Sequence, residues 1–412
     1  MLVEFSVANF RSVKDKITLS MLADGEGFSL LKTAVIYGAN ASGKSNVLKA
    51  INFMLGMLRN RVDVNGFPIS INQSSDELHY DCFRLSEETE KAPTHIEVIF
   101  CIENDLYRYG FEYDRNTVYK EWLYSGSPEN DEETELFNRI NEEVKINEES
   151  FTEGINLNAN LLPNTLFLWK CDQNKGKTAN LILKEFAKNI NWFDGMKYRK
   201  KGNVEYRKKD IDNKVIKILT HLDTDIESIS VKENKMEDLG GIINAAINLI
   251  SNHENISVIT THTKFNSDGQ KNGKVSFDLY EEESLGTQKL FHILYPILDA
   301  LENGNLLLID EFEASLHPHI VDYLIRLFKD PKINNKNAQL IFATHDTSLL
   351  NSGLFDRPEI WITEKDRFGA TDLIALLEYK KEEGEDVKKN YHWGKYGGIP
   401  NITLNPHDIR GN

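Results

Sequence analysis

Short runs of residues, either alternating between apolar and polar or rich in apolar residues, dominate the first 125 positions of the chain and predict β-strands. The first run occupies residues 1–8, and the others, rich in aromatic and β-branched residues, occupy residues 33–37, 80–85, 94–103, 105–113 and 117–124. Glu103-Asn104-Asp105 is typical of a tight turn between two strands. We therefore expect an antiparallel meander, with one amphipathic helix over residues 46–55.

The middle of the chain has a different pattern. Residues 125–160 are acidic and rich in asparagine, which predicts a mobile loop or a poorly ordered insert. Helical periodicity dominates residues 161–253 and is clearest over residues 179–192 and 210–221. One predicted strand, at residues 226–231, interrupts these helices.

The last part of the chain alternates between predicted strands and helices. The strands occupy residues 256–261, 274–280, 306–309, 339–343 and 359–363, and the helices residues 287–302 and 316–328. Such alternation predicts a parallel sheet. We therefore expect an α/β head with a mixed sheet and an antiparallel β meander, formed by residues 1–125 and 255–412. Residues 126–254 would form an acidic loop and a mainly helical insertion.

The most specific motif follows the strand at residues 33–37. Residues 38–45 read Gly-Ala-Asn-Ala-Ser-Gly-Lys-Ser and match the phosphate-binding P-loop, G-x-x-x-x-G-K-S. The backbone N–H groups of such a loop, and the helix that follows it, surround phosphate oxygens. Lys44 would reach the β- and γ-phosphates, and the Ser45 hydroxyl would ligate Mg²⁺. The residues expected to bind the nucleoside triphosphate are Gly38, Asn40, Gly43, Lys44, Ser45 and Asn46.

The apolar strand at residues 306–309 ends in two carboxylates that fit the same site. Asp310 would hold Mg²⁺ through water opposite Ser45, and Glu311 would orient or deprotonate the attacking water. The alternative is a buried strand that ends in acidic residues where it meets solvent. The presence of a P-loop favours the metal site.

Thr344 and His345 follow the strand at residues 339–343. A histidine at this place can donate a hydrogen bond to the γ-phosphate and report its presence, whereas a surface or capping histidine is the alternative. Its order in the chain, after Asp310 and Glu311, favours the functional role.

Glu283-Ser284-Leu285-Gly286-Thr287-Gln288 directly precedes a predicted helix. Ser284 and the Gly286 N–H group at that helix terminus would form a second phosphate-binding surface. An ordinary N-cap is the alternative, and the two interpretations are compatible. Because one chain cannot easily aim both this surface and the P-loop at one nucleotide, we expect a two-fold dimer with ATP between its subunits.

Composition narrows the class of protein further. The chain has 64 Asp+Glu against 48 Lys+Arg, which argues against a generally basic, nucleic-acid-coating surface. A local basic cluster at residues 197–209 could bind DNA or RNA, or could be a solvated helix face. Three widely spaced cysteines, Cys82, Cys101 and Cys171, predict buried free thiols. With neither a signal peptide nor an apolar run near 20 residues, we expect a soluble cytoplasmic protein that does not bind membranes.

The chain resembles the ABC-type ATPases of the RecF, SMC-like and OLD-nuclease group. More closely it resembles the stand-alone "AAA family" ATPases of prokaryotic abortive-infection and restriction loci (AbiL-like and RloA-like). Besides the motifs above, the resemblance is carried by Asn9-Phe10-Arg11-Ser12, by Ser315-Leu316-His317-Pro318 and by Lys395-Tyr396-Gly397-Gly398-Ile399-Pro400.

The resemblance implies an ABC head that dimerises on ATP, with Ser284 and Gly286 as a signature motif acting in trans and His345 as the switch histidine. It makes residues 314–316 the D-loop and Gln173 the candidate Q-loop glutamine, a further Mg²⁺ ligand; a buried helix with a polar end explains Gln173 equally well. Arg11 would approach the nucleotide or be a surface arginine. Leu285 and Thr287 depart from the small residues of the usual signature.

Two functions fit these observations. The first is an ATP-hydrolysing regulatory module of an anti-phage defence system that controls a separate effector, a nuclease or toxin. The second is a DNA-repair or chromosome-organising clamp closed by ATP. A transporter ATPase is disfavoured because more than two hundred residues separate the P-loop from Asp310. A GTPase is disfavoured because the guanine-reading motif Asn-Lys-x-Asp is missing.

Overall fold

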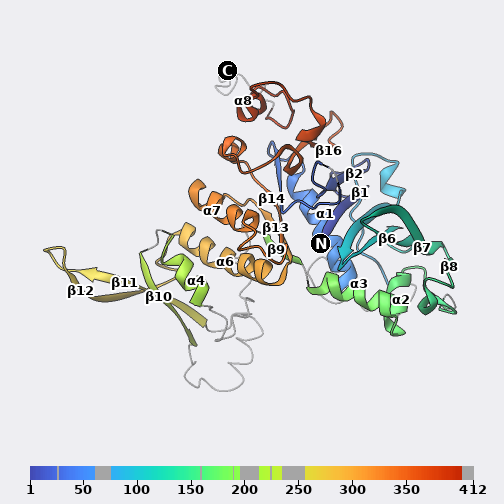
Figure 1. Ribbon diagram of the computed structural model, residues 1–412, viewed down its shortest axis with the longest axis horizontal. Helices are drawn as coiled ribbons and strands as arrows, with labels where there is room; N and C mark the ends of the chain where they lie inside the picture. The colour runs from blue at the N-terminus through green and yellow to red at the C-terminus, as the bar shows by residue number, and fades with distance from the viewer. Residues whose placement is uncertain are drawn as a thin grey trace, which may run out of the picture. The chain divides into compact units, whose positions relative to one another are not determined.

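The computed structural model describes residues 1–25, 27–60, 76–157, 160–188, 190–194, 213–222, 225–233 and 256–400. The chain divides into two compact units. The first comprises Met1–Trp192, Ala300–Asp310 and Ile325–Asn412, and the second Phe193–Asp299 and Glu311–Leu324. The three-part division expected from the sequence stays a prediction. Two boundaries between these units fall within helices α6 (Leu285–Asn303) and α7 (Pro318–Lys329). Figure 1 labels both helices.

An antiparallel sheet forms much of the first unit, with strand order β2-β1-β4-β5-β6-β7-β8. Its central strands are consecutive in the chain, and Ile102 pairs with Asp105 across the turn predicted at residues 103–105. The predicted meander is therefore confirmed. The strands are β1 (Leu2–Ala8), β2 (Ile17–Ser20), β4 (Thr94–Ile102), β5 (Asp105–Tyr113), β6 (Val118–Ser127), β7 (Asn130–Ile140) and β8 (Glu143–Ile146).

The loop expected over residues 125–160 is a wrong prediction for much of its length, because β7 and β8 continue the meander there. Phe137 and Arg139 of β7 are buried. Acidic side chains of the same strand have partners on other strands of the sheet: Glu133 accepts from Arg108 of β5, and Glu135 accepts from the Tyr124 hydroxyl of β6. These cross-strand pairs stabilise an acidic strand that composition alone predicts to be disordered.

A buried ion pair attaches helix α2 (Phe167–Gln173) to this sheet. Glu121 of β6 and Arg139 of β7 are 0% and 1% exposed, and Arg139 Nη1 lies 3.6 Å from Glu121 Oε2. The Glu121 carboxylate also accepts hydrogen bonds from the Tyr109 hydroxyl and from the N–H groups of Phe167 and Leu168. Burial raises the pKa of Glu121, whereas Arg139 and these donors favour its charged form. Glu121 thus supplies acceptors for the first amides of α2.

The second sheet of the first unit is mixed, with strand order β16-β15-β3-β14-β13-β9. Its four central strands β15, β3, β14 and β13 are parallel, which confirms the predicted parallel sheet. The carboxyl ends of these strands therefore meet at one edge. The strands are β3 (Thr33–Gly38), β9 (Ile190–Asp194), β13 (Leu306–Asp310), β14 (Gln339–Ala343), β15 (Ile360–Lys365) and β16 (Thr371–Ala375).

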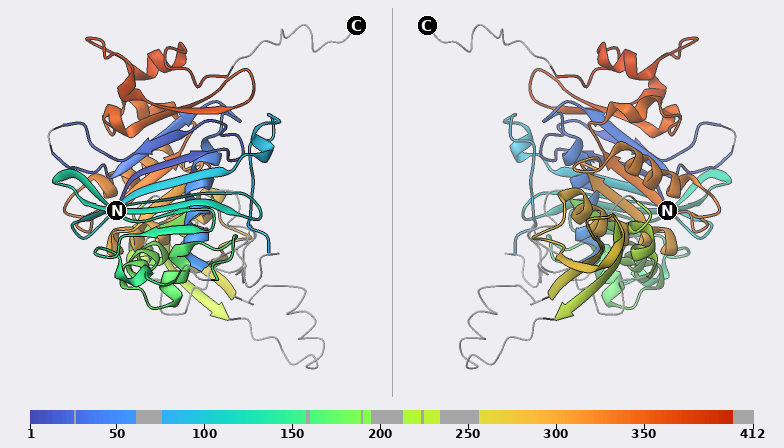
Figure 2. Two further views of the ribbon diagram at one scale, coloured as in Figure 1. Left: turned by 90° about the vertical axis from the view of Figure 1, so that its right-hand side faces the viewer. Right: turned by 90° about the vertical axis from the view of Figure 1, so that its left-hand side faces the viewer.

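Helix α1 (Lys44–Asn60) lies between the two sheets. On one side its Phe53 ring lies 5.5 Å from the ring of Phe10 and 6.2 Å from that of Tyr113, a residue of β5. On another side α1 contacts β3, β13 and β14. In the left view of Figure 2, strands of the antiparallel sheet cross in front of α1. Its buried apolar side chains are Val47, Leu48, Ala50, Ile51, Met54, Leu55, Met57 and Leu58.

The strand predicted at residues 80–85 is wrong, because this segment is a loop without regular structure. Its backbone bonds to the turn after β1 instead of to a strand. Phe83 N–H donates to the Asn9 side-chain carbonyl at 2.9 Å, and Arg11 N–H donates to Asp81 O at 2.8 Å. Side-chain acceptors of this kind compete with the hydrogen bonds of a ladder.

The helix predicted over residues 179–192 ends early. Helix α3 (Lys177–Lys188) is followed by β9, whose Ile-Asn-Trp-Phe sequence pairs at the edge of the mixed sheet. Strand pairing here prevails over local helical periodicity. Helix α4 (Asn213–Leu219) lies within the predicted range 210–221, and α8 (Val387–His392) was not predicted.

The second unit contains a three-stranded antiparallel sheet of β10 (Ile226–Glu233), β11 (Ile256–Phe265) and β12 (Lys271–Asp278). These strands confirm the three predicted in this region, apart from shifts at their ends. Within the ranges that the structure describes, no helix is both long and apolar enough to cross a bilayer. Cys82 and Cys171 are buried free thiols, and Cys101 is half-buried.

Candidate nucleotide-binding site

The P-loop connects β3 to α1 at the carboxyl edge of the mixed sheet. Gly43 has a φ of 114°, which favours glycine, and a Cβ atom there would collide with the Thr371 side chain. A Cβ atom on Gly38 would collide with Thr363 and Ser42. Both glycines of the motif are therefore required by the close packing of the loop against β15 and β16.

Lys44 is almost fully buried, 6% exposed, at the centre of this edge. Its ammonium donates to Gly38 O at 2.8 Å and to Ala39 O at 3.0 Å, and its Nζ lies 3.5 Å from His345 Nδ1. His345 comes two residues after β14, the strand next to β3. The structure thus brings together two predicted site residues that are 301 positions apart.

Asp310 is the last residue of β13, the next strand along the same edge. The carboxylate is 8% exposed, and its buried Oδ1 has no hydrogen-bond partner within the described part of the chain. A buried carboxylate oxygen without a protein donor is costly unless a cation or water satisfies it. This free oxygen is of the kind that Mg²⁺ prefers, and the role of Asp310 and the half-buried Ser45 as its ligands stays a prediction.

Two threonines that the sequence analysis did not identify hold the P-loop to strands β15 and β16. The hydroxyls of Thr363 and Ser42 are 2.6 Å apart, and Thr363 Oγ1 also donates to Tyr37 O. Thr371 donates to Ser42 O at 2.8 Å. No local signal marks either threonine, because each lies more than 300 residues from the loop that it contacts.

The carboxyl-terminal motif at residues 395–400 packs against the start of the P-loop. A Cβ atom on Gly398, which has a φ of 68°, would collide with Ile362 Cγ2 at 2.6 Å and would lie 3.3 Å from Thr363 O and 3.4 Å from Gly38 Cα. The Tyr391 hydroxyl of α8 donates to Gly398 O at 3.0 Å, and its ring lies 5.8 Å from that of Tyr37. The motif therefore supports β3 where the phosphate loop begins.

Replacing Gly398 by alanine should lower ATP affinity by about 10-fold, because a methyl group must displace the side chain of Ile362, which pairs with Tyr37 just before the P-loop, in addition to its own backbone strain of about 1 kcal/mol. Gly384→Ala is a matched control, since Gly384 has a similar φ of 71° but nothing within 4 Å of its position. Calorimetric titration with ATP would compare the two variants. Equal affinities would contradict a role of this motif in the site.

Arg11 lies beside the P-loop helix. Its Nε is 2.7 Å from Asp81 Oδ2, and it lines a cavity of about 460 Å³ together with Ser12 and Asn46. The Asn46 side chain donates to the Ser12 hydroxyl at 2.7 Å. The structure therefore brings Arg11 to the side of α1 that carries Asn46.

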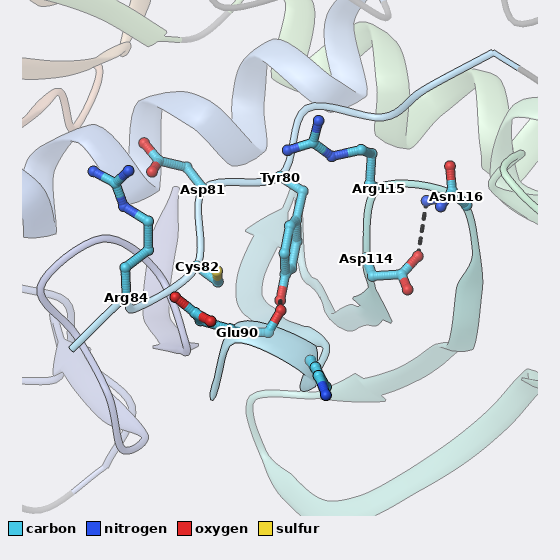
Figure 3. Close-up of a pocket in the computed structure, with 9 residues that line it drawn as sticks. Tyr80, Asp81, Cys82, Arg84, Glu90, Asp114, Arg115 and Asn116 are labelled. Carbon is cyan, nitrogen blue, oxygen red and sulfur yellow. Dashed lines mark hydrogen bonds between the residues drawn. The ribbon is translucent and has the colours of Figure 1, made fainter. Parts of the chain in front are cut away.

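A second cavity, of about 670 Å³, shares Asp81, Cys82 and Arg84 with the first. Figure 3 shows Tyr80 between Arg84 and Asp81 on one side and Arg115 on the other. Burial raises the pKa of Tyr80. Cations and carboxylates are mixed along this wall, so its charge favours no particular class of ligand.

The structure does not bring Gln173 to the P-loop through any contact in the described ranges. Gln173 is the exposed last residue of α2, and its neighbour Asp172 bonds to Asn180 of α3. Asn40 is exposed within the P-loop. The roles of Gln173 and Asn40 stay predictions. The basic cluster at residues 197–209 lies outside the described residues.

The signature motif lies in the second unit, at the start of α6. The exposed Ser284 caps this helix, because its hydroxyl accepts from Thr287 N–H at 3.1 Å. Gly286 lies against the loop that follows Glu311, since a Cβ atom there would be 2.7 Å from Ser315 O. Lys289, one turn further on, donates to the backbone of Glu311. Burial lowers the pKa of Lys289 to about 8.

A phosphate loop between β3 and α1, a buried lysine within it and, two strands away, an aspartate whose Oδ1 has no hydrogen-bond partner among the described residues are the parts of a P-loop ATPase. Comparison of the sequence with known families agrees, because residues 34–351 match the family described as "AAA domain, putative AbiEii toxin, Type IV TA system". The chain belongs to this family of ATP-binding ATPases.

None of the curated proteins matches the sequence. Among solved structures, the chain is similar to the recombination mediator protein RecF-ATPrS in the RecFOR pathway, with 14% identity over 91% of this chain and 98% of that one and a TM-score of 0.34. It is also similar to RecF-ATP of the same pathway, with 15% identity over 91% and 97% of the two chains and a TM-score of 0.32.

Proposed function

We propose that this protein binds ATP with Mg²⁺, dimerises through the nucleotide and hydrolyses it, and thereby regulates a separate effector in a prokaryotic anti-phage system. The observation that carries the proposal is the Lys44 ammonium, buried against Gly38 O and Ala39 O with His345 3.5 Å away. A buried ammonium beside a ring of loop amides attracts the charge of a triphosphate.

Each residue has a distinct role in this proposal. Lys44 neutralises the β- and γ-phosphates, and His345 contacts the γ-phosphate beside it. Ser45 and Asp310 would hold Mg²⁺, which supplies charge neutralisation at the phosphates. Glu311, the residue after Asp310 in the chain, would take the proton of the attacking water. Arg11 would approach the nucleotide from the cavity beside Asn46.

Dimerisation completes the site in this proposal. Ser284 and Gly286 would bind the γ-phosphate held by a second copy, using the amides at the start of α6. The description of the family, which names a putative toxin and a type IV TA system, supports the defence role. The separate effector, a toxin or nuclease, is part of the proposal. The cytoplasm is the compartment in which ATP and such an effector meet.

The test is the size of the Glu311→Gln variant with and without ATP. Loss of the general base should slow hydrolysis by about 100-fold and trap a dimer that light scattering coupled to size exclusion detects. The double variant Lys44→Ala/Glu311→Gln is the control, and it should stay monomeric because it cannot bind ATP. A Glu311→Gln particle that is unchanged by ATP would contradict dimerisation through the nucleotide.

Salt-dependent binding of DNA is the outcome that would favour the alternative, an ATP-closed DNA clamp. Loss of phage protection in cells that express Lys44→Ala together with the neighbouring gene would support the defence role. Protection that persists in that variant would contradict it.

A further inference from the structure

Lys289, in the second turn of α6, is a buried cation that the site described above does not use. The residue is 1% exposed, and its ammonium donates to Glu311 O at 2.7 Å and to Phe312 O at 3.0 Å. Within the described ranges these two backbone carbonyls are its hydrogen-bond acceptors, and the nearby carboxylates of Glu313 and Glu311 act on it only through space, opposing the effect of burial on its pKa. Burying a charge in this way is expensive and calls for a specific use.

The backbone that Lys289 contacts has an unusual conformation. Glu311 has a φ of 53°, in the left-handed region that residues other than glycine rarely adopt. This conformation costs about 1–2 kcal/mol. The carbonyls of Glu311 and Phe312 both accept from the Lys289 ammonium. The positive charge of Lys289 therefore stabilises the turn that sets the position of the Glu311 side chain.

A second contact joins the same two segments. Gly286, one turn before Lys289, lies so close to Ser315 that a Cβ atom would be 2.7 Å from its carbonyl oxygen. Ser315 also has a left-handed φ, of 62°. The first turns of α6 and residues 311–315 are therefore held together at both ends of the loop, by one ammonium and by one close approach of the backbone.

We infer that Lys289 is a positioning residue, which fixes the backbone of Glu311 and links the signature helix to the general base of the same chain. This inference rests on the proposed function, because it takes Glu311 as the base. A phosphate bound at Ser284 and Gly286 would then stabilise the start of α6, and through Lys289 the orientation of Glu311. Occupation of one nucleotide site would thereby prepare hydrolysis in the other.

The ammonium is suited to this role because it has three donors on a compact centre and can satisfy two carbonyls at once. A methionine in place of Lys289 would keep most of the apolar part of the side chain but would have no hydrogen-bond donors. Both carbonyls then lose their charged partner, and the left-handed turn loses its stabilisation. Glutamine retains a neutral donor and should have an intermediate effect.

The experiment is steady-state ATP hydrolysis by Lys289→Met and Lys289→Gln. Misplacing a catalytic group by about 1 Å costs on the order of 100-fold in rate, so kcat should fall by about 10- to 100-fold in the methionine variant and less in the glutamine variant. KM and the affinity for ATP should change by less than about 3-fold, because Lys289 does not contact nucleotide in this scheme. A merely structural role would change affinity and rate together.

His292→Leu is a matched control on the same helix. His292 is 5% exposed, and burial lowers its pKa to about 4, so its replacement also removes a buried polar ring but no charge at neutral pH. This variant should retain kcat within about 3-fold. A loss equal to that of Lys289→Met would assign the effect to packing of α6 and overturn the inference.

A double-mutant cycle with Glu311→Gln decides whether Lys289 acts through Glu311. Lys289→Met should not slow the residual hydrolysis of Glu311→Gln further, because the group that it positions is already absent. Multiplicative losses would overturn the inference.

The same variants distinguish a failure of the proposed function from a failure of this inference. If Glu311→Gln hydrolyses ATP at the normal rate, the proposed function is wrong. If Glu311→Gln is impaired while both Lys289 variants retain normal kcat, only the present inference is wrong. Should Lys289→Met fail to fold, Lys289→Gln gives the same comparison.

Discussion

Replacing Lys44 by alanine is expected to lower the affinity for ATP by about 1,000-fold. Lys44 is 6% exposed and its ammonium is the one cation seen at the start of α1 in the described P-loop. Removing one partner of a buried charge pair typically costs about 3–5 kcal/mol, and 4.1 kcal/mol corresponds to a factor of 1,000 in affinity. Isothermal titration with ATP and Mg²⁺ measures the change.

Lys49→Ala serves as the control for this variant. Lys49 lies on the same helix, one turn and a half further on, and is only half-buried. Its removal should leave the affinity within about 2-fold, because its charge is outside the loop. Comparable weakening by both substitutions would show that the net charge of α1, and not the placement of Lys44, determines binding.

Glu121→Ala is expected to destabilise the first unit by about 3–5 kcal/mol. The substitution leaves Arg139, 1% exposed, without its carboxylate, and it leaves the N–H groups of Phe167 and Leu168 without acceptors. Chemical denaturation followed by tryptophan fluorescence would report the change, because Trp122 adjoins Glu121 in sequence and Trp169 adjoins Leu168, whose N–H group loses its acceptor. The transition assigned to the first unit is the relevant one, since a chain of two units need not unfold in one step.

Two further variants sharpen this prediction. Glu143→Ala removes an exposed carboxylate from β8 of the same sheet and should change stability by less than about 0.5 kcal/mol. The double variant Glu121→Leu/Arg139→Met should be more stable than either single variant, because it leaves no uncompensated buried charge. A double variant that is less stable than both would contradict the assignment of the effect to unpaired charge.

The parts of the site that the sequence predicted are those encoded by contiguous residues. The P-loop is eight consecutive residues between a strand and a helix, and Asp310 ends an apolar strand. His345 could be expected from chain order, and the structure places it against Lys44. The P-loop, Asp310 and His345 each lie at the carboxyl end of a strand, β3, β13 and β14, so these strands alone place them at the same edge of the sheet.

The parts that could not be predicted depend on residues far apart in the chain. Thr363 and Thr371 have no local signal, yet both bond to the P-loop. Lys289 looks like an ordinary helix lysine until its contact with Glu311 is known. Strand β7 could not be predicted because its acidic side chains obscure the alternation of apolar and polar residues. Residues 80–85 form a loop and not the predicted strand, because the Asn9 side chain accepts a hydrogen bond from the Phe83 N–H group.

The contacts of Thr363 and Thr371 with Ser42 have a consequence for synthesis of the protein. Ser42 and Thr363 are 321 positions apart in the chain. At a translation rate of about 5–20 residues per second, on the order of 16 to 64 s pass between their appearance. During that interval the nascent chain exposes a phosphate loop whose supporting strands have not been made. The ribosome therefore releases a competent ATP site late, and a chaperone that shields β3 would have about half a minute in which to act.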